Sequence, residues 1–168
     1  NFLDVGPVQP NIRYMKNLPV SQELKSKLKE EFSKKELNVT IEKVLHTSDS
    51  MHDCDIANKI AQHISSIVGC EVYPAYIKLG SREYLPPRTE PGTTAIQIIL
   101  DGDGPITWDE AVDVYYDNAV LDLGRMHSIQ ASDTSDRIFF HISIIDKSYK
   151  EVLEIINGRE EEIFNVVL

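Results

Sequence analysis

Two stretches of the chain carry apolar residues at the spacing of an amphipathic helix. Leu24, Leu28 and Phe32 follow one another at intervals of four residues, which places them on one helical face. Ser21 is a favourable N-cap, so we predict a helix from there to about Lys35. A second helix is predicted from regularly spaced isoleucines followed by a glycine: Ile56, Ile60, Ile64, Ile67 and Gly69.

Two further helices are predicted from capping boxes, in which Ser or Thr is followed three residues later by Glu. The segment 107–110, Thr-Trp-Asp-Glu, fits this pattern and predicts a helix that continues to about Leu123. The segment 148–151, Ser-Tyr-Lys-Glu, fits it as well. It predicts a short helix that ends at the Asn-Gly pair 157–158.

Alternation of apolar and polar residues predicts strands elsewhere. Over residues 37–45, Leu37, Val39 and Ile41 share one side, and polar residues lie between them. The prolines of 84–92 predict a loop. The other predicted strands cover residues 12–15, 71–79, 94–100, 137–145 and 163–168.

The order of these elements indicates the fold class. Helices and strands alternate along the chain, but two strands follow one another in the middle. This order favours an α+β domain with mixed or antiparallel sheets over a doubly wound parallel sheet. No internal segment resembles a linker, so residues 1–168 are predicted to form a single domain.

The composition is that of an ordinary globular protein with an acidic surface. Hydrophobic residues make up 42% and charged residues 26%, and the formal net charge is -10. This charge argues against extensive coating of nucleic acid, although it leaves room for a local site that binds one phosphate. No apolar run approaches the roughly 20 residues of a membrane helix, so no membrane partner is expected.

The two cysteines are too few to build a disulfide scaffold. Cys54 and Cys70 also form no Cys-x-x-Cys pattern, which excludes a zinc site made of cysteines. Whether the two pair with each other stays open. We expect an intracellular location, in the cytoplasm or the nucleus. The sequence begins at Asn1 without Met or a signal-like segment, which is compatible with part of a longer multidomain protein.

Candidate chemistry is concentrated on the predicted strand 137–145. His141 and Ser143 are two residues apart, so they point to the same side, while the apolar residues between and around them point to the other. The imidazole can transfer a proton near neutral pH, and the hydroxyl can donate to a phosphoryl oxygen. The alternative interpretation is a strand with one solvated face.

Two segments could supply a second copy of this pair. Asn38 and Thr40 have the same spacing on a predicted strand, but Asn cannot act as a general acid or base. His46 has the right chemistry, but the segment 46–48, His-Thr-Ser, lies where the strand ends. The residues alone do not distinguish the two.

Paired His-x-Thr/Ser motifs on two central strands resemble the 2H phosphoesterases, the LigT-like cyclic phosphodiesterases. Phe-His-Ile-Ser-Ile at 140–144 is similar to the second motif of that family. Leu-Asn-Val-Thr-Ile at 37–41 is similar to the first, with Asn in place of His. The strand 12–15, followed by the Leu-Pro pair at 18–19 and a helix, also resembles the family. The end of the chain is similar, more loosely, to the cyclic phosphodiesterase domain of fungal-type tRNA splicing ligases.

The resemblance implies a bilobal 2H-phosphoesterase-like α+β fold that hydrolyses 2′,3′-cyclic phosphate ends of RNA or nucleotides, without a metal or other cofactor. It implies that His141 transfers a proton and that Thr40 and Ser143 hold the phosphate oxygens. Asn38 would then mark a disabled first motif, unless His46 takes its place. RNA processing, RNA repair and tRNA splicing are the roles that this reading implies.

Two other functions remain open on the sequence. A non-catalytic module on the same fold would bind a phosphate or an RNA end, which Asn38 would permit. An acidic protein-interaction domain is the other alternative, and the net charge of -10 favours it slightly.

Overall fold

Two antiparallel sheets make up most of the molecule. The computed structural model describes residues 14–90, 92–108 and 113–168. The larger sheet has the strand order β1 (Met15–Asn17), β9 (Asn118–Asp122), β6 (Thr94–Asp101), β11 (Arg137–Ile144), β4 (Tyr73–Leu79), β3 (Leu45–Thr47) and β2 (Val39–Ile41). The smaller sheet has the order β5 (Tyr84–Arg88), β10 (His127–Gln130), β7 (Ile106–Trp108) and β8 (Asp113–Val114).

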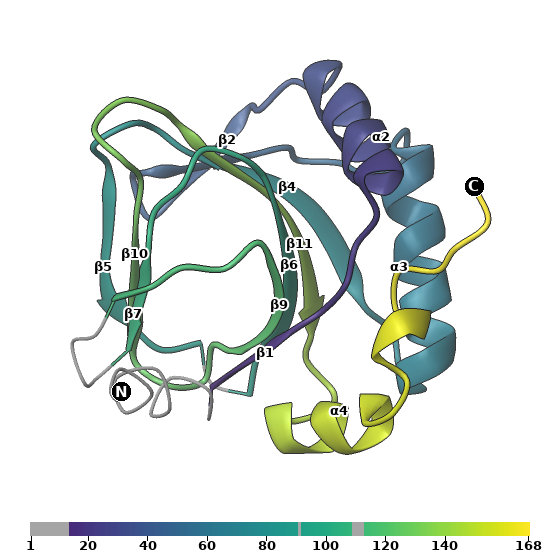
Figure 1. The fold of residues 1–168 in the computed structure, drawn as a ribbon. Helices are drawn as coiled ribbons and strands as arrows, with labels where there is room; N and C mark the ends of the chain where they lie inside the picture. Colours follow the sequence, from purple (N-terminus) through teal and green to yellow (C-terminus); the bar gives the residue numbers. More distant parts are fainter. Residues whose placement is uncertain (1–13, 91, 109–112) are drawn as a thin grey trace.

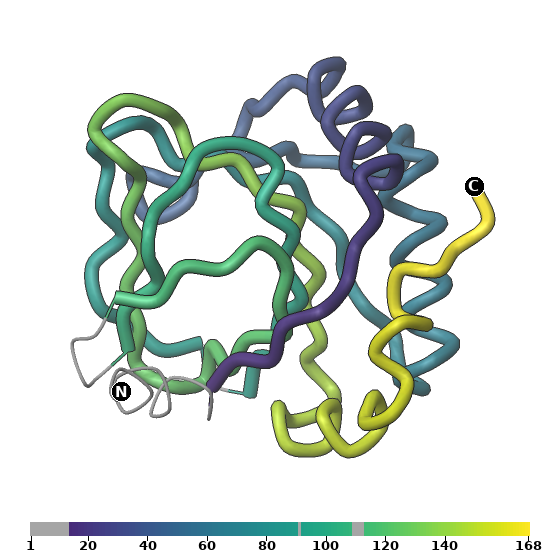
Figure 2. The backbone as a smooth tube through the Cα atoms, in the orientation of Figure 1, coloured from purple at the N-terminus to yellow at the C-terminus, as the bar shows by residue number. Residues whose placement is uncertain are grey.

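The helices cover one face of the larger sheet, and the smaller sheet faces the other. In Figure 1 the helices lie to the right of β6 and β11, and β5, β7 and β10 lie to the left. Figure 2 shows the last segment of the chain running back along α3. The helical elements are α2 (Gln22–Ser33), α3 (Asp55–Val68), α4 (Tyr149–Ile156) and the short 3-10 helix η1 (Glu160–Glu162).

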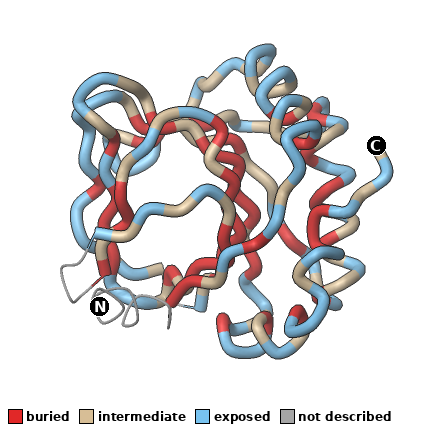
Figure 3. Tube along the Cα trace, in the orientation of Figure 1, coloured by how far each residue is buried: buried red, intermediate tan, exposed pale blue. Residues whose placement is uncertain are grey.

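The larger sheet therefore contributes to two separate cores. Phe140 and Ile142 of β11 belong to the core under the helices, together with Ile60 and Ile64 of α3. Phe139, from the opposite face of β11, belongs to the core between the sheets. That second core includes residues of the smaller sheet: Leu85, Ile106, Trp108 and Ile129. Figure 3 accordingly shows the central strands β6 and β11 buried along most of their length.

Several local predictions are confirmed because they depend on neighbouring residues alone. The Ser21 side chain accepts from the backbone N–H of Leu24 at 3.1 Å, as the predicted cap of α2 requires. Gly69 ends α3 with φ 80°, a left-handed conformation that favours glycine. Both bonds of the capping box between Ser148 and Glu151 are present at α4.

The helix predicted over 107–123 is wrong, and this changes the fold class. Residues 109–112 of that prediction lie outside the described residues, but the flanking segments form β7, β8 and β9. The Thr107 hydroxyl donates across the sheet to the Asp113 carboxylate at 2.8 Å instead of capping a helix. Because β7 and β8 belong to the smaller sheet and β9 belongs to the larger one, the predicted bilobal 2H-phosphoesterase-like α+β fold is also wrong.

Other element predictions also need correction. The predicted strand 37–45 is interrupted by a turn and gives two antiparallel strands, β2 and β3. Part of the predicted loop 84–92 is β5, an edge strand, where prolines are tolerated because only one side of the strand pairs with another strand. The predicted final strand does not form, since residues 163–168 pair with no other strand, and Ile163 and Phe164 pack into the core under the helices. The predicted first strand 12–15 lies partly outside the described residues, and β1 begins at its last residue.

Glu31 joins two helices and the sheet through one carboxylate. It accepts from the backbone N–H groups of Ile56 and Ala57, at 2.7 and 3.0 Å, at the first turn of α3. The Tyr76 hydroxyl of β4 donates to the same carboxylate at 2.7 Å. Burial and the adjacent Glu31 raise the pKa of Tyr76, so this hydroxyl keeps its proton and remains a donor.

Replacing Glu31 with Ala should destabilise the protein by about 2 kcal/mol, because two helix N–H groups and a buried hydroxyl lose their acceptor. The matched control is Glu30→Ala, which removes an exposed carboxylate one residue away. Urea unfolding should show a change below about 0.5 kcal/mol for this control. Equal losses in the two variants would contradict the assigned role.

Candidate functional site

A cavity of about 320 Å³ lies between the two sheets. Residues of β2, β3, β4, β6 and β11 line it on one side, and residues of β5, β7 and β10 line it on the other. Its apolar lining consists of Ile41, Leu45, Ala75, Ile77, Leu85, Ile106, Leu123, Ile129 and Phe139. Its polar lining consists of Thr47, Ser48, Glu90, Gln97, His127, His141 and Ser143.

The alternation of β11 places two of these polar residues in the cavity. Phe140 and Ile142 pack under the helices, so His141 and Ser143 point to the opposite face of the sheet. The imidazole Nε2 of His141 and the Ser143 hydroxyl are 2.9 Å apart. The neighbouring strand β6 contributes Gln97, whose Nε2 lies 3.0 Å from Nδ1 of His141.

His141 is held in its neutral form. Burial lowers its pKa to about 4, and the nearby negative charge of Glu90 opposes that shift only in part. A neutral imidazole carries one N–H and one lone pair, so it can donate through one nitrogen and accept through the other. His141 therefore acts near neutral pH as a hydrogen-bonding group and not as a cation.

Glu90 and His127 form a second polar pair in the wall of the cavity. His127 is only 2% exposed, and its Nε2 lies 3.4 Å from Oε2 of Glu90. Its other ring nitrogen, Nδ1, lies 2.7 Å from the backbone oxygen of Arg125, which fixes Nδ1 as the donor. Burial acts to raise the pKa of Glu90, but the His127 bond and nearby positive charges outweigh it and lower the pKa.

The other three residues of the predicted site lie elsewhere. Leu45 and Thr47 line the cavity, so His46 between them points to the other face of the sheet. Its Nδ1 lies 3.4 Å from the hydroxyl of Thr40, its cross-strand neighbour. The exposed Asn38 accepts from the backbone N–H of Asp49 at 3.0 Å. The structure thus brings together only two of the five residues, His141 and Ser143.

The part of the chain that the structure describes contains neither a candidate metal site nor a candidate site for thiol chemistry. There, no three His, Cys, Asp or Glu side chains are grouped so that they could hold a metal ion. Cys54 and Cys70 are free cysteines and form no disulfide. Burial raises the pKa of Cys54 to about 11, so it is not a thiolate near neutral pH. No described helix combines the length and the apolar character needed to cross a membrane.

Sequence reasoning missed Glu90, Gln97 and His127. One signal was available, because Gln97 is the single polar residue inside the apolar run from Ala95 to Leu100. A polar residue in a strand buried on both faces needs a partner, and here it has two. Glu90 and His127 carried no such signal, since they meet only when the smaller sheet folds over the larger one.

The sequence matches no known protein family and none of the characterised proteins. Solved structures that match part of the chain include a protein from Thermotoga maritima described as a predicted oxalate decarboxylase, with a TM-score of 0.42 and 21% identity. That match covers 60% of this chain and 80% of the other. Another is an uncharacterized protein from Klebsiella pneumoniae with a double-stranded β-helix domain, with a TM-score of 0.40 and 11% identity over 46% of this chain and 66% of the other. A third is an RmlC-like cupin protein from Desulfovibrio desulfuricans, with a TM-score of 0.36 and 14% identity over 43% of this chain and 71% of the other.

The interpretation as a 2H phosphoesterase is wrong. The two predicted motifs do not converge, because His141 and Ser143 face the cavity, whereas Thr40 and His46 face the other side of the sheet. The predicted hydrolysis of cyclic phosphates, and with it the implied role in RNA repair and tRNA splicing, is therefore wrong.

The two alternative functions, a module that binds phosphate or RNA ends and an acidic protein-interaction domain, are not supported either. None of the described residues that line the cavity is a lysine or an arginine, so the site offers a phosphate no cationic side chain. The Glu90 carboxylate, whose pKa is lowered, would repel such a ligand. A module that binds phosphate or RNA ends is thus unsupported, and the acidic protein-interaction domain gains no support from the structure or the comparisons.

Because His141 is neutral in the folded protein, it should make folding pH-dependent. The unfolded chain protonates this histidine near its ordinary pKa of 6.5, whereas the folded protein resists protonation down to about 4. Its contribution is therefore fully present above 6.5 and is lost as the pH falls towards 4. Between pH 7 and pH 5 the loss should amount to about 2 kcal/mol.

Urea unfolding at the two pH values tests this contribution. His141→Gln should reduce the loss of stability between pH 7 and pH 5 by about 2 kcal/mol relative to the unsubstituted protein. His52→Gln, which removes an exposed histidine, is the control and should leave the loss nearly unchanged. The same pH dependence in all three proteins would contradict a buried neutral His141.

Proposed function

We propose that the chain binds a small, mainly apolar organic molecule in the cavity between its two sheets. The observation that carries the proposal is the combination of an apolar lining with polar groups that converge at one place. A volume of about 320 Å³ lies at the small end of the range found for ligand pockets. The ligand would thus be about the size of a substituted benzene ring.

The charges in the wall favour an electrically neutral ligand. Glu90 is ionised near neutral pH, since its pKa lies below the ordinary value. His141, which is also in the wall, carries no compensating charge, because burial keeps it neutral. His127 already pairs with Glu90, and the described lining holds no lysine or arginine, so an anionic ligand would find no cationic side chain and would be repelled by the Glu90 carboxylate. A neutral molecule with one or two polar atoms fits the lining better.

Acetophenone, a neutral aromatic ketone, is a suitable probe. Its addition should shift the methyl NMR signals of Ile77 and Ile129, which belong to opposite sheets, because both side chains line the cavity. Ala75→Phe should weaken the binding at least about tenfold, since the added ring would occupy the cavity.

Ile145→Phe is the matched control for that experiment. It adds the same ring at an exposed position outside the cavity, so binding should be retained. Acetophenone binding that survives Ala75→Phe, or shifts that spare both isoleucines, would show that the cavity is not the ligand site.

The Glu90–His127 pair supports a second candidate function, acid–base catalysis on the bound molecule. A carboxylate and an imidazole 3.4 Å apart can accept and return a proton. A neutral carbonyl compound bound beside them would be open to removal of a proton from the carbon next to its carbonyl group. Chemistry of this type requires no group beyond the side chains that the structure describes.

Hydrogen–deuterium exchange of the acetophenone methyl group in D2O measures such proton removal. The protein should accelerate the exchange, and Glu90→Gln should reduce the acceleration at least about tenfold by removing the base. Glu83→Gln, which neutralises an exposed carboxylate, should have no effect. Acetophenone that binds without accelerated exchange would identify a binding protein and not a catalyst.

A further inference from the structure

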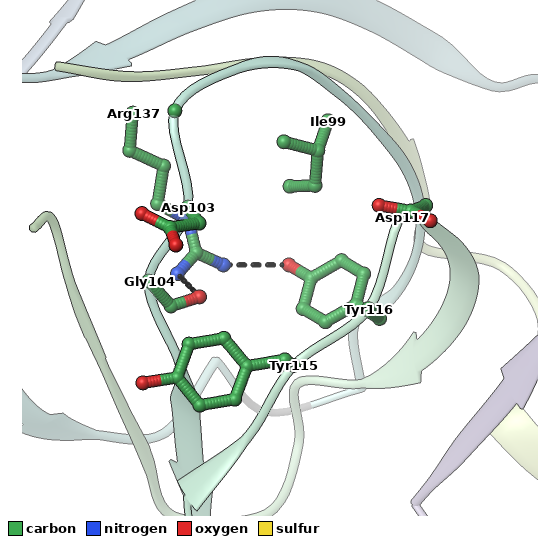
Figure 4. Close-up of a pocket in the computed structure, with 8 residues that line it drawn as sticks. Ile99, Asp103, Gly104, Tyr115, Tyr116, Asp117 and Arg137 are labelled. Carbon is green, nitrogen blue, oxygen red and sulfur yellow. Dashed lines mark hydrogen bonds between the residues drawn. The ribbon is translucent and has the colours of Figure 1, made fainter. Parts of the chain in front are cut away.

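A buried arginine begins a chain of hydrogen bonds that leads into the cavity. Arg137, at the start of β11, is 1% exposed. Its Nη1 donates to three backbone oxygens, those of Gly104, of Pro105 at 3.0 Å and of Gln130 at 3.2 Å. Its Nη2 donates to the Tyr116 hydroxyl at 2.9 Å. Figure 4 shows the guanidinium group between Gly104 and the Tyr116 ring.

From Tyr116 the chain continues through side chains already placed in the site. The Tyr116 hydroxyl bonds to Oε1 of Gln97, and Nε2 of Gln97 bonds to Nδ1 of His141 at 3.0 Å. Nε2 of His141 then bonds to the Ser143 hydroxyl at 2.9 Å. Four hydrogen bonds therefore connect a permanently charged group, Arg137, with a hydroxyl that lines the cavity.

The arginine determines the direction of every bond in this chain. A guanidinium group can only donate, so the Tyr116 oxygen accepts from it and the Tyr116 proton is left to donate to Gln97. Burial raises the pKa of Tyr116 against the effect of the Arg137 charge, so that proton stays in place. With Oε1 of Gln97 accepting, its amide N–H₂ faces His141 and donates to Nδ1.

The last step fixes the tautomer of His141. Its Nδ1 accepts, so the single proton of the neutral ring lies on Nε2 and is donated to the Ser143 oxygen. The Ser143 oxygen is thereby used as an acceptor, and its own hydrogen is free to point into the cavity that it lines. All four hydrogen bonds donate in the same direction, from Arg137 towards Ser143, and hydrogen bonds aligned in this way strengthen one another.

We propose that Arg137, acting through Tyr116, Gln97 and His141, makes Ser143 a hydrogen-bond donor that selects ligands with a neutral carbonyl oxygen. This inference rests on the proposed binding of a small molecule in the cavity and names its class. A carbonyl oxygen accepts a hydrogen bond and carries no charge, so it satisfies Ser143 without repulsion from Glu90. A hydrocarbon of the same shape would leave the Ser143 hydrogen without an acceptor. Arg137, Tyr116, Gln97 and His141 are positioning residues, because they act on the ligand only through Ser143.

The tautomer of His141 can be read directly from the ¹⁵N NMR shifts of its two ring nitrogens. The unsubstituted protein should show a protonated Nε2 and an unprotonated Nδ1. Gln97→Glu should reverse this assignment, because a carboxylate at that position would draw the proton to Nδ1. Nε2 would then accept from Ser143, and the Ser143 hydrogen would be withdrawn from the cavity. A structural role alone would not reverse the tautomer.

Ligand affinity is the second readout. Acetophenone and ethylbenzene have nearly the same shape, but only the ketone has an acceptor. The unsubstituted protein should bind acetophenone at least about fivefold more tightly, the ratio expected for one net hydrogen bond. Ser143→Ala and Gln97→Glu should both abolish this preference. Thr94→Val, which removes a buried hydroxyl on β6 that donates to the Lys147 oxygen, should keep it.

The outcomes separate this inference from the proposed function. Equal binding of the two ligands, still blocked by Ala75→Phe, would leave the cavity as a ligand site and overturn the role of the chain. A protonated Nδ1 in the unsubstituted protein would overturn it as well, even if Gln97→Glu failed to fold. Binding of neither ligand would overturn both the inference and the proposed function.

Discussion

The structure depends on one strand, β11, being buried on both of its faces. Side chains alternate along a strand, so β11 must present apolar residues to the helices at every second position. Phe140, Ile142 and Ile144 meet that requirement in the core under the helices. The positions between them are then free to differ, and they carry Arg137, Phe139, His141 and Ser143 towards the smaller sheet. The fold thereby places polar residues inside the molecule without interrupting the core that holds it together.

Polar side chains in such a place must be paired, because an unsatisfied buried group costs on the order of 1–3 kcal/mol. Most of these groups, although not Nε of Arg137, are paired by hydrogen bonds that run from strand to strand. Gln97 of β6 bonds to Tyr116 on one side and to His141 on the other. The absence of a positive charge on His141 follows from the same burial. Stability and chemistry thus have a common origin, since the bonds that satisfy these groups also fix which atoms donate into the cavity.

The sequence was sufficient wherever structure depends on residues close together in the chain. The cap at Ser21, the glycine at the end of α3 and the capping box of α4 are examples. The shared direction of His141 and Ser143 also followed from strand alternation alone. The capping pattern at 107–110 misled, because the strands around it pair with distant parts of the chain.

The smaller sheet explains most of the remaining errors. Its strands are two to five residues long, and their pairing brings together segments such as Tyr84–Arg88 and His127–Gln130. Short strands carry little periodic signal, so neither the sheet nor the approach of Glu90 to His127 could be recognised. The resemblance to phosphoesterases rested on two short motifs, and the structure places those motifs on opposite faces of the larger sheet.

The proposed functional site is the space between the two sheets. Intermolecular nuclear Overhauser effects between bound acetophenone and the protein methyl groups test this most directly. We expect contacts from Ile77 of the larger sheet and Ile129 of the smaller sheet to the same ligand molecule. Contacts confined to methyl groups of the core under the helices, such as those of Ile60 and Ile64, would contradict it.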